Sequence, residues 1–280
     1  MHIDAAAAAL VLAVMLGPRK DYAHKAMLPH SVPFTLLGTG LLWFGWFGFN
    51  GGSALGANPQ AGLAFVNTLL APMATLCVWV ALDSFRSGMV TAIGAATAIV
   101  VGLVAITPAA GYVSPRAALA IGAIAAAPSY FAILYRTRTR LDDSLDVVAA
   151  HGLGGATGAL LTGVFAQKLY TGSTGGLLEG NPRQLGIQAI GVLAAAAFSG
   201  ACTFLLVKVV SLVSTFRASD RDERFGLDTT QHGEEAYTRG DGALLILADQ
   251  KGNVPVPPRR TKPDEPPPTA RDARESPRRS

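Results

Sequence analysis

Two histidines lie inside stretches of sequence that are otherwise almost free of polar side chains. His2 opens the first stretch, and His151 lies in the sixth, within the glycine-rich segment 146–158. An imidazole in such surroundings is costly unless it is hydrogen-bonded, and a lone one commonly has a structural role. Two neutral imidazoles can instead share a hydrogen bond and pass a proton. If they do so here, their ring nitrogens must lie no more than about 5 Å apart.

The second apolar stretch ends in a cluster of aromatic and small residues that is followed by a hydroxyl. Trp46 and Phe49 belong to this cluster, residues 43–53, and Ser53 closes it. One interpretation is a belt of aromatic rings at the membrane interface. Another is a cation–π cage with a hydroxyl acceptor, suited to a small cation. The pattern alone leaves both interpretations open.

The other charged residues near apolar stretches have simpler explanations. Three aspartates precede the sixth stretch and can cap the helix and stabilise its dipole there: Asp142, Asp143 and Asp146. Lys208 lies near the end of the last stretch, from which its long side chain can reach the membrane interface.

The composition is that of a membrane protein. Only 15% of the 280 residues are charged, against about 25% in an average soluble domain. Residues 1–215 contain 11 Lys and Arg and 7 Asp and Glu, whereas the remaining 65 residues contain 12 of each kind. This excludes an ordinary soluble enzyme, a coiled coil and a nucleic-acid binder. Cys77 and Cys202 have no disulfide or metal-ligand spacing and are interpreted as buried small hydrophobic residues.

Seven apolar stretches predict an all-α polytopic membrane protein with about seven transmembrane helices. Each is long enough, or nearly so, to cross a bilayer core of about 30 Å. We interpret the first as a retained helix, because a signal peptide would carry basic residues where Asp4 lies. The stretches cover residues 3–17, 33–51, 61–82, 88–107, 117–135, 145–167 and 186–215.

Loop charges predict the orientation of the chain. If the first helix runs from outside to inside, seven basic residues fall in inside loops and three in outside loops. The inside residues are Arg19, Lys20, Lys25, Arg86, Arg136, Arg138 and Arg140, and the outside ones are Arg116, Lys168 and Arg183. We therefore expect a transmembrane domain over 1–216, a cytoplasmic tail over 217–250, and a disordered Pro/Arg-rich tail over 251–280.

Several motifs together resemble the ammonium transporter family (Amt, methylammonium permease and Rhesus proteins). They follow in the family's order and spacing over roughly residues 2–240. The segments are His2–Ala6, with Asp4 where Asn is expected, Phe47–Ser53, Ala64–Thr68, Asp146–Gly158, Gly226–Asp228 and His232–Tyr237.

The resemblance implies a transporter, not an enzyme, that moves ammonium or ammonia without a cofactor or a metal. It implies that His2 and His151 are twin pore histidines, that Phe49 is an outer gate, that Ser53 accepts ammonium at an outer recruitment site, and that Trp46 lines the pore. It also implies a multi-pass protein of the cell membrane with a cytoplasmic tail, a homotrimer, and a P-II signal protein as a cytoplasmic partner in nitrogen metabolism.

Family members resemble an eleven-helix fold, of which this sequence matches the last seven helices. We therefore expect an N-terminally truncated form that does not transport on its own. One alternative is a non-transporting regulatory or vestigial membrane protein. A more remote one is a seven-helix retinal photoreceptor with Lys208 as the Schiff-base lysine, although the third stretch lacks an acidic counter-ion.

Overall fold

The structure is a computed structural model that describes residues 1–20, 22 and 29–234. The chain divides into two compact units, Met1–Arg217 and Ala218–Ser280, and each is described by itself. The helices of the first unit are α1 (His2–Leu16), α2 (Val32–Gly52), α3 (Pro59–Ser87), α4 (Ala92–Ile106), α5 (Pro115–Arg136), the π-helix η1 (Val148–Leu153), α6 (Gly154–Phe165), α7 (Lys168–Thr171), the 3₁₀ helix η2 (Leu177–Glu179) and α8 (Pro182–Ser211).

Five helices in the described part of the chain are long and apolar enough to cross a membrane. They are α2, α3, α5, the continuous segment Val148–Phe165 and α8. The two other predicted spans are the apolar helices α1 and α4, of 15 residues each, which extend about 22 Å. The all-helical membrane fold is therefore confirmed, while seven complete crossings stay a prediction.

Local sequence explains where the long helices begin. Ser31, Asn58, Thr91 and Ser114 each precede a helix and accept a backbone N–H of its first turn. Such capping satisfies donors that have no partner within the helix. Pro33, Pro59, Pro115 and Pro182 follow within the first two positions, where a missing N–H costs little.

Helices α3, α4, α5 and α6 form the core because small residues allow their backbones to approach closely. A Cβ at Gly122 of α5 would lie 2.1 Å from the carbonyl oxygen of Ala71 in α3. A Cβ at Gly158 of α6 would lie 2.0 Å from the carbonyl oxygen of Ala105 in α4. Only glycine therefore fits at these two crossings.

Buried polar side chains satisfy backbone groups inside this core. Asn67 is fully buried, and its Nδ2 donates to the carbonyl oxygens of Ala110 and Val113 at 2.8 and 2.9 Å. These carbonyls lie in the turns between α4 and α5, where no helix supplies a donor. Such pairing is what permits irregular backbone in a protein that is surrounded by lipid.

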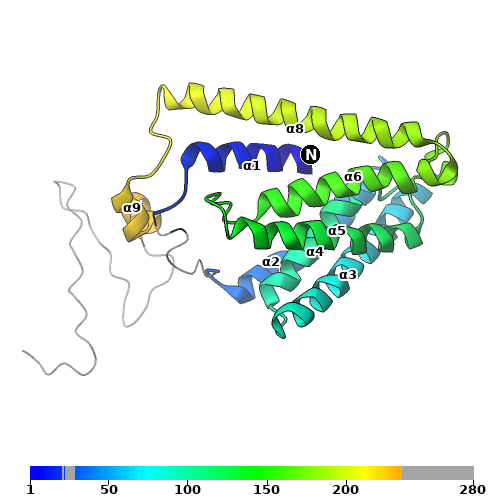
Figure 1. The fold of residues 1–280 in the computed structure, drawn as a ribbon, viewed down its shortest axis with the longest axis horizontal. Coiled ribbons are helices and arrows are strands. Elements are labelled where there is room, and N and C mark those ends of the chain that lie inside the picture. The colour runs from blue at the N-terminus through cyan, green and yellow to red at the C-terminus, as the bar shows by residue number, and fades with distance from the viewer. Residues whose placement is uncertain (21, 23–28, 235–280) are drawn as a thin grey trace, which may run out of the picture. The chain divides into compact units, whose positions relative to one another are not determined.

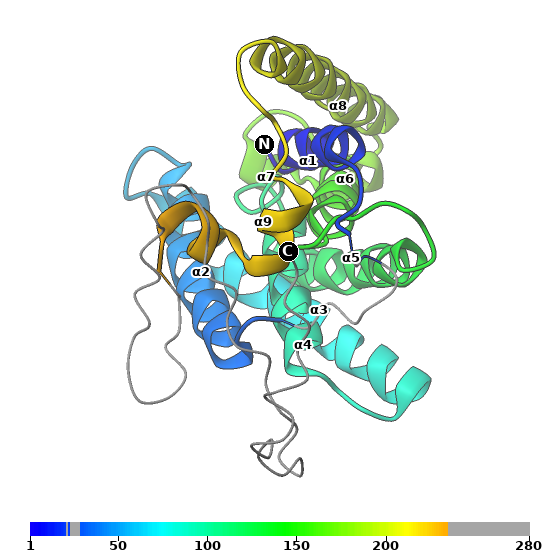
Figure 2. The same cartoon turned by 90° about the vertical axis from the view of Figure 1, so that its left-hand side faces the viewer.

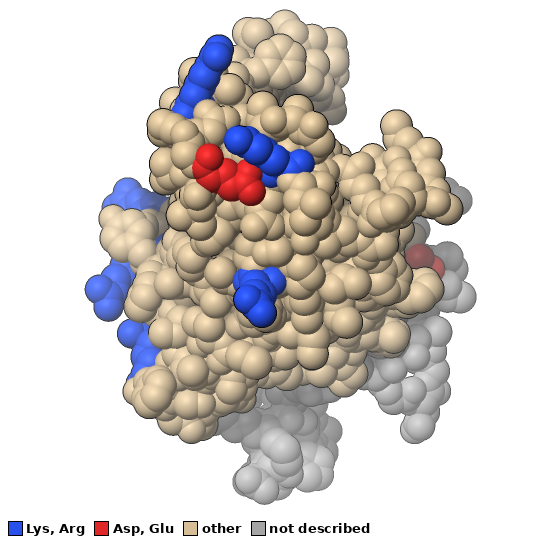
Figure 3. Space-filling model, turned by 90° about the vertical axis from the view of Figure 1, so that its right-hand side faces the viewer, with Lys and Arg blue, Asp and Glu red and all other residues tan. Residues whose placement is uncertain are grey.

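Helix α8 lies on the outside of the first unit, alongside α1 and α6 (Figures 1 and 2). Only 6% of its most apolar window is buried, and for α2 the value is 11%. Apolar side chains on both helices are thus exposed. Figure 3 shows a side of the molecule that is mostly uncharged, with acidic and basic side chains adjoining at one place and further basic side chains along one edge.

The second unit is described as far as Glu234. It contains α9 (Asp220–Phe225), capped by the Ser219 hydroxyl, and the π-helix η3 (Asp228–His232). The remainder of the predicted tail 217–250 and all of 251–280 lie outside the described residues.

Candidate functional site

The two histidines of the apolar stretches lie side by side. The Nδ1 atom of His151, in η1, is 3.4 Å from the Nδ1 atom of His2, in the first turn of α1. The ring centroids are 5.5 Å apart. Because a neutral imidazole carries a single N–H, one Nδ1 donates and the other accepts in such a pair. This distance is within the reach that a shared hydrogen bond requires.

Trp46 of α2 stacks on His2. Their ring centroids are 5.4 Å apart and their planes differ by 17°. The indole Nε1 of Trp46 donates to Oγ1 of Thr107 at 2.9 Å, just beyond the end of α4. Phe49 lies 6.2 Å from His2 and 5.4 Å from Trp46, measured between ring centroids. The structure therefore groups His2, His151, Trp46 and Phe49.

Ser53 is not part of this group. It is exposed at the end of α2, and its hydroxyl donates to the carbonyl oxygen of Phe49 at 2.9 Å. The aromatic cluster around it is divided. Trp43 donates to the carbonyl oxygen of Thr68, and Phe47 stacks on Phe65 with centroids 4.2 Å apart, so both pack on α3. Neither predicted interpretation, a belt or a cage, accounts for all of these rings.

Two apolar hollows meet at His2. One, of about 450 Å³, is lined by Met1, His2, Leu41, Leu42, Gly45, Trp46 and Phe49. The other, of about 230 Å³, is lined by Met1, His2, Ile3, Thr107, Pro108, Gly155 and Ala159. The Nε2 atom of His2 is buried and has no hydrogen-bond partner among the residues that the structure describes. A small polar molecule at this ring would therefore meet an unused nitrogen in apolar surroundings.

A π-helical turn carries His151. Segment η1 begins at Val148, whose N–H donates to Oδ2 of Asp143 at 2.7 Å. Two residues earlier Asp146 has a positive φ of 54°. Glycines make the close contact with α1 possible, since a Cβ at Gly155 would lie 3.1 Å from the Cβ of His2. The hydropathy pattern predicted a helix here but contained no signal for the π-turn.

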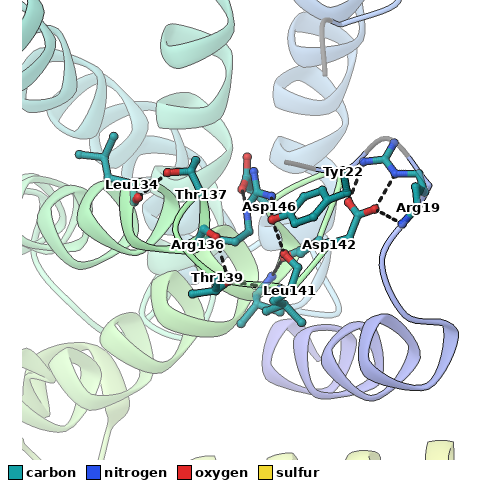
Figure 4. Close-up of polar contacts among 11 residues, drawn as sticks. Arg19, Tyr22, Leu134, Arg136, Thr137, Thr139, Leu141, Asp142 and Asp146 are labelled. Carbon is teal, nitrogen blue, oxygen red and sulfur yellow. Dashed lines mark hydrogen bonds and ion pairs between the residues drawn. The ribbon is translucent and has the colours of Figure 1, made fainter. Parts of the chain in front are cut away.

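Two ion pairs join the chain at the C-terminal ends of α1 and α5 to the loop that precedes η1 (Figure 4). Arg19 binds Asp142 through both side-chain oxygens at 2.7 Å, and Arg136 Nε binds Oδ1 of Asp146 at 2.6 Å. The Arg19 hydrogen bonds lower the pKa of Asp142. Burial raises the pKa of Asp146, against the opposing effect of Arg136. Asp143 thus caps the segment as predicted, whereas the carboxylates of Asp142 and Asp146 bind arginines instead of capping the helix. Their stabilisation of the helix dipole stays a prediction.

The remaining predicted residues are a lysine and two cysteines on α8 and α3. Lys208 is exposed on α8, with Nζ 5.5 Å from the ring centroid of Phe204. Cys202 is half-buried but Cys77 is exposed on α3, so the prediction of burial is wrong for Cys77. In the described ranges, no three His, Cys, Asp or Glu side chains are placed to hold a metal ion.

Comparison with known proteins decides the family. The family model described as Ammonium Transporter Family matches residues 1–237. The chain belongs to the ammonium transporter family. Its sequence is 45% identical over 238 residues to an ammonium transporter of Aquifex aeolicus, covering 85% of this chain and 55% of that protein. It is 41% identical to the ammonium transporter Amt1 of Archaeoglobus fulgidus, covering 85% of this chain and 60% of the relative.

Solved structures of ammonium transporter family members agree with the fold. Mep2 of Saccharomyces cerevisiae matches with a TM-score of 0.70 and 36% identity, over 76% of this chain and 50% of that one. A structure described as a sensor Amt protein matches with a TM-score of 0.74 and 34% identity, over 82% and 57%. This ammonium transporter family chain therefore spans between one half and three fifths of the length of these relatives.

Family membership also bears on the alternatives. The relatives are named as transporters, and membership does not favour a retinal photoreceptor. The sequence reasoning missed Thr107 as the partner of Trp46, and Tyr22 and Arg136 as partners near Asp146. Thr107 lies at the end of an apolar stretch, and no feature of the sequence distinguishes it from the other threonines of these stretches.

Proposed function

We propose that this chain contributes the histidine-lined part of a pore that carries ammonium or ammonia across the cell membrane. The observation that carries the proposal is the contact between His2 and His151, with Nδ1 atoms 3.4 Å apart and Trp46 stacked on His2. The names of the relatives support ammonium as the substrate. Phe49 is proposed as an outer gate above this pair, Trp46 as a pore-lining residue, and Ser53 as a recruitment residue on the same side.

Desolvation explains how such a site discriminates between ions. A bare ammonium ion in an apolar hollow loses its hydration, so giving up a proton to become ammonia is favoured. Ammonia then crosses beside the imidazoles, which can donate to it or accept from it according to their tautomers. The Nε2 atom of His2, which has no hydrogen-bond partner among the described residues, is available for such a hydrogen bond. Potassium cannot release a proton and remains excluded by its desolvation cost.

The proposal must be tested in a protein of the relatives' full length, because this chain matches only part of them. The chain spans 55% of the A. aeolicus relative, and the resemblance places the unmatched part of that relative before His2. We therefore join that part to this chain in a chimera. The readout is growth of an ammonium-transport-deficient strain on low ammonium at acidic pH, where free ammonia is scarce.

We expect growth with the chimera, its loss on His151→Ala, and no growth with the 280-residue chain alone. The matched control is His30→Ala, which changes an exposed histidine before α2. Equal growth with and without His151→Ala would refute the histidine role. Growth with the chain alone would show that these residues suffice for a pore.

The assembly and partner are proposed from the resemblance. The chain would form a homotrimer in the cell membrane, with the segment after Arg217 in the cytoplasm, where a P-II signal protein binds. The basic residues Arg19 and Arg136 at one end of the first unit agree with a cytoplasmic location of that end. Deletion of 217–250 should abolish co-purification with P-II, and unchanged recovery would remove this partner.

A further inference from the structure

We infer that the Arg136–Asp146 ion pair is a positioning device for His151. It holds the backbone conformation from which the π-turn starts, and it thereby fixes where the His151 ring lies relative to His2. The inference rests on the proposed role of the histidine pair. Neither Arg136 nor Asp146 touches either imidazole, so both act through the backbone.

The backbone at Asp146 adopts an uncommon conformation that an external contact can select. Asp146 and Leu55 are the two non-glycine residues with positive φ in the part of the chain that the structure describes. Non-glycine residues are uncommon in this left-handed region, although aspartate adopts it more readily than most, so a contact to the side chain can select this conformation over the alternatives. Leu55 is 95% exposed in a loop, whereas Asp146 directly precedes the segment that carries His151.

This contact comes from the end of α5. Arg136 is the last residue of that helix, and its Nε contacts Oδ1 of Asp146 at 2.6 Å. The two side chains are only 18% and 23% exposed. Arg136 Nη1 also donates to the hydroxyl of Tyr22, which in turn donates to the carbonyl oxygen of Leu141 at 2.7 Å. Figure 4 shows these contacts converging on the loop that leads to the sixth predicted span.

The path from Asp146 to His151 is short and hydrogen-bonded. The carbonyl oxygen of Asp146 accepts the N–H of Ala150 at 2.8 Å, and Asp143 holds the N–H of Val148. A π-turn contains one more residue than an α-turn, so it changes the direction in which its side chains point. The Cβ that an alanine would add at Gly152 lies 3.0 Å from the Cβ of Ala6, so η1 has little space in which to rotate without losing the histidine contact.

The test follows the histidine contact itself in the full chain. We would label the histidines with ¹⁵N in the protein reconstituted in lipid bilayers and record through-space ¹⁵N–¹⁵N correlations. The unchanged protein should give a cross-peak between the Nδ1 atoms of His2 and His151. Arg136→Gln should abolish it, Asp146→Asn should weaken it at least twofold, and Arg136→Lys should restore part of it relative to Arg136→Gln.

Asp142→Asn is the matched control, because it breaks the neighbouring Arg19 pair and leaves Asp146 in place. It should leave the cross-peak unchanged. Circular dichroism identifies any variant that fails to fold. If the Arg136 variants fail to fold, the cross-peak of Asp146→Asn decides the test, because asparagine tolerates the left-handed region and this variant should keep the fold.

An unchanged cross-peak in folded Asp146→Asn, an equal loss in Asp142→Asn, or no cross-peak in the unchanged protein would each overturn the inference. These outcomes are distinct from a failure of the proposed function. A chimera that does not support growth would refute transport while leaving the response of the cross-peak intact.

Discussion

Trp46 lies almost parallel to the ring of His2, and its indole N–H is hydrogen-bonded to Thr107 at the end of α4. The indole Nε1 donates to Oγ1 of Thr107, whose own proton goes to the carbonyl oxygen of Leu103. The threonine therefore accepts from one partner and donates to another. This arrangement fixes the plane of the indole against the imidazole.

Replacing Thr107 by valine should loosen this stack. The substitution keeps the shape but leaves the Trp46 N–H without its acceptor, which should cost about 1–3 kcal/mol in the free energy of unfolding. Thermal unfolding of the purified protein in detergent measures the loss. Thr97→Val is the control, because the hydroxyl of Thr97 donates within its own helix to the carbonyl oxygen of Ile93. Equal losses for the two variants would contradict the assigned role of Thr107.

Adding a methyl group at Gly122 should destabilise the core. The new Cβ would lie 2.1 Å from the carbonyl oxygen of Ala71, so α3 and α5 must move apart, at a cost of about 1–3 kcal/mol. In Gly191→Ala on α8, the new Cβ would have no neighbouring atom within 4 Å. This substitution should stabilise its helix by about 0.5–1 kcal/mol. The midpoints of thermal unfolding should thus shift in opposite directions. A Gly122→Ala variant as stable as the unchanged protein would show that the helices approach less closely.

Asn67→Ala should be more costly than the removal of an exposed helix cap. It leaves the carbonyl oxygens of Ala110 and Val113 without this donor in a buried site. Each unsatisfied carbonyl should lower the free energy of unfolding by about 1–3 kcal/mol. Asn58→Ala removes the cap of α3 at the surface, for about 1 kcal/mol. Unfolding midpoints of the two variants should therefore rank Asn67→Ala below Asn58→Ala, and the reverse order would contradict the role given to Asn67.

The Arg19–Asp142 pair should make the stability of the protein depend on acid pH. The pKa of Asp142 is lower in the folded state than its ordinary value, because Arg19 hydrogen-bonds the carboxylate. The folded state therefore gains stability at pH values above the ordinary aspartate pKa of about 3.9. This gain is lost as the pH falls through the lower folded-state pKa.

The measurement compares the unchanged protein with Asp142→Asn. Because the Arg19 side chain is 45% exposed, we expect a loss of only about 1 kcal/mol at pH 6. The difference between the two unfolding midpoints should shrink below about pH 4. Arg19→Gln should behave in the same way as Asp142→Asn. A difference that stays constant down to pH 3 would show that the ion pair does not titrate as argued.

The sequence by itself determined the helices, because their signals are local. Apolar runs placed the seven main helical segments, and caps explain most shifts at their ends. The fourth stretch was expected from residue 88, but α4 begins at Ala92 because Thr91 caps it. Likewise α3 continues to Ser87 and ends where Gly88 takes a φ of 72°. The pattern also singled out His2 and His151, since polar groups in apolar stretches are costly.

The tertiary structure alone decided which polar groups meet. His2 and His151 are separated by 149 residues, and only the packing of α1 on η1 brings their rings together. The three aspartates before the sixth span look alike in sequence, yet one caps a helix and two bind arginines from different segments. Hydropathy is a property of each residue and its neighbours, whereas a hydrogen bond requires two groups at a fixed distance and angle. That distance depends on how glycines such as Gly122 and Gly158 let whole helices approach one another.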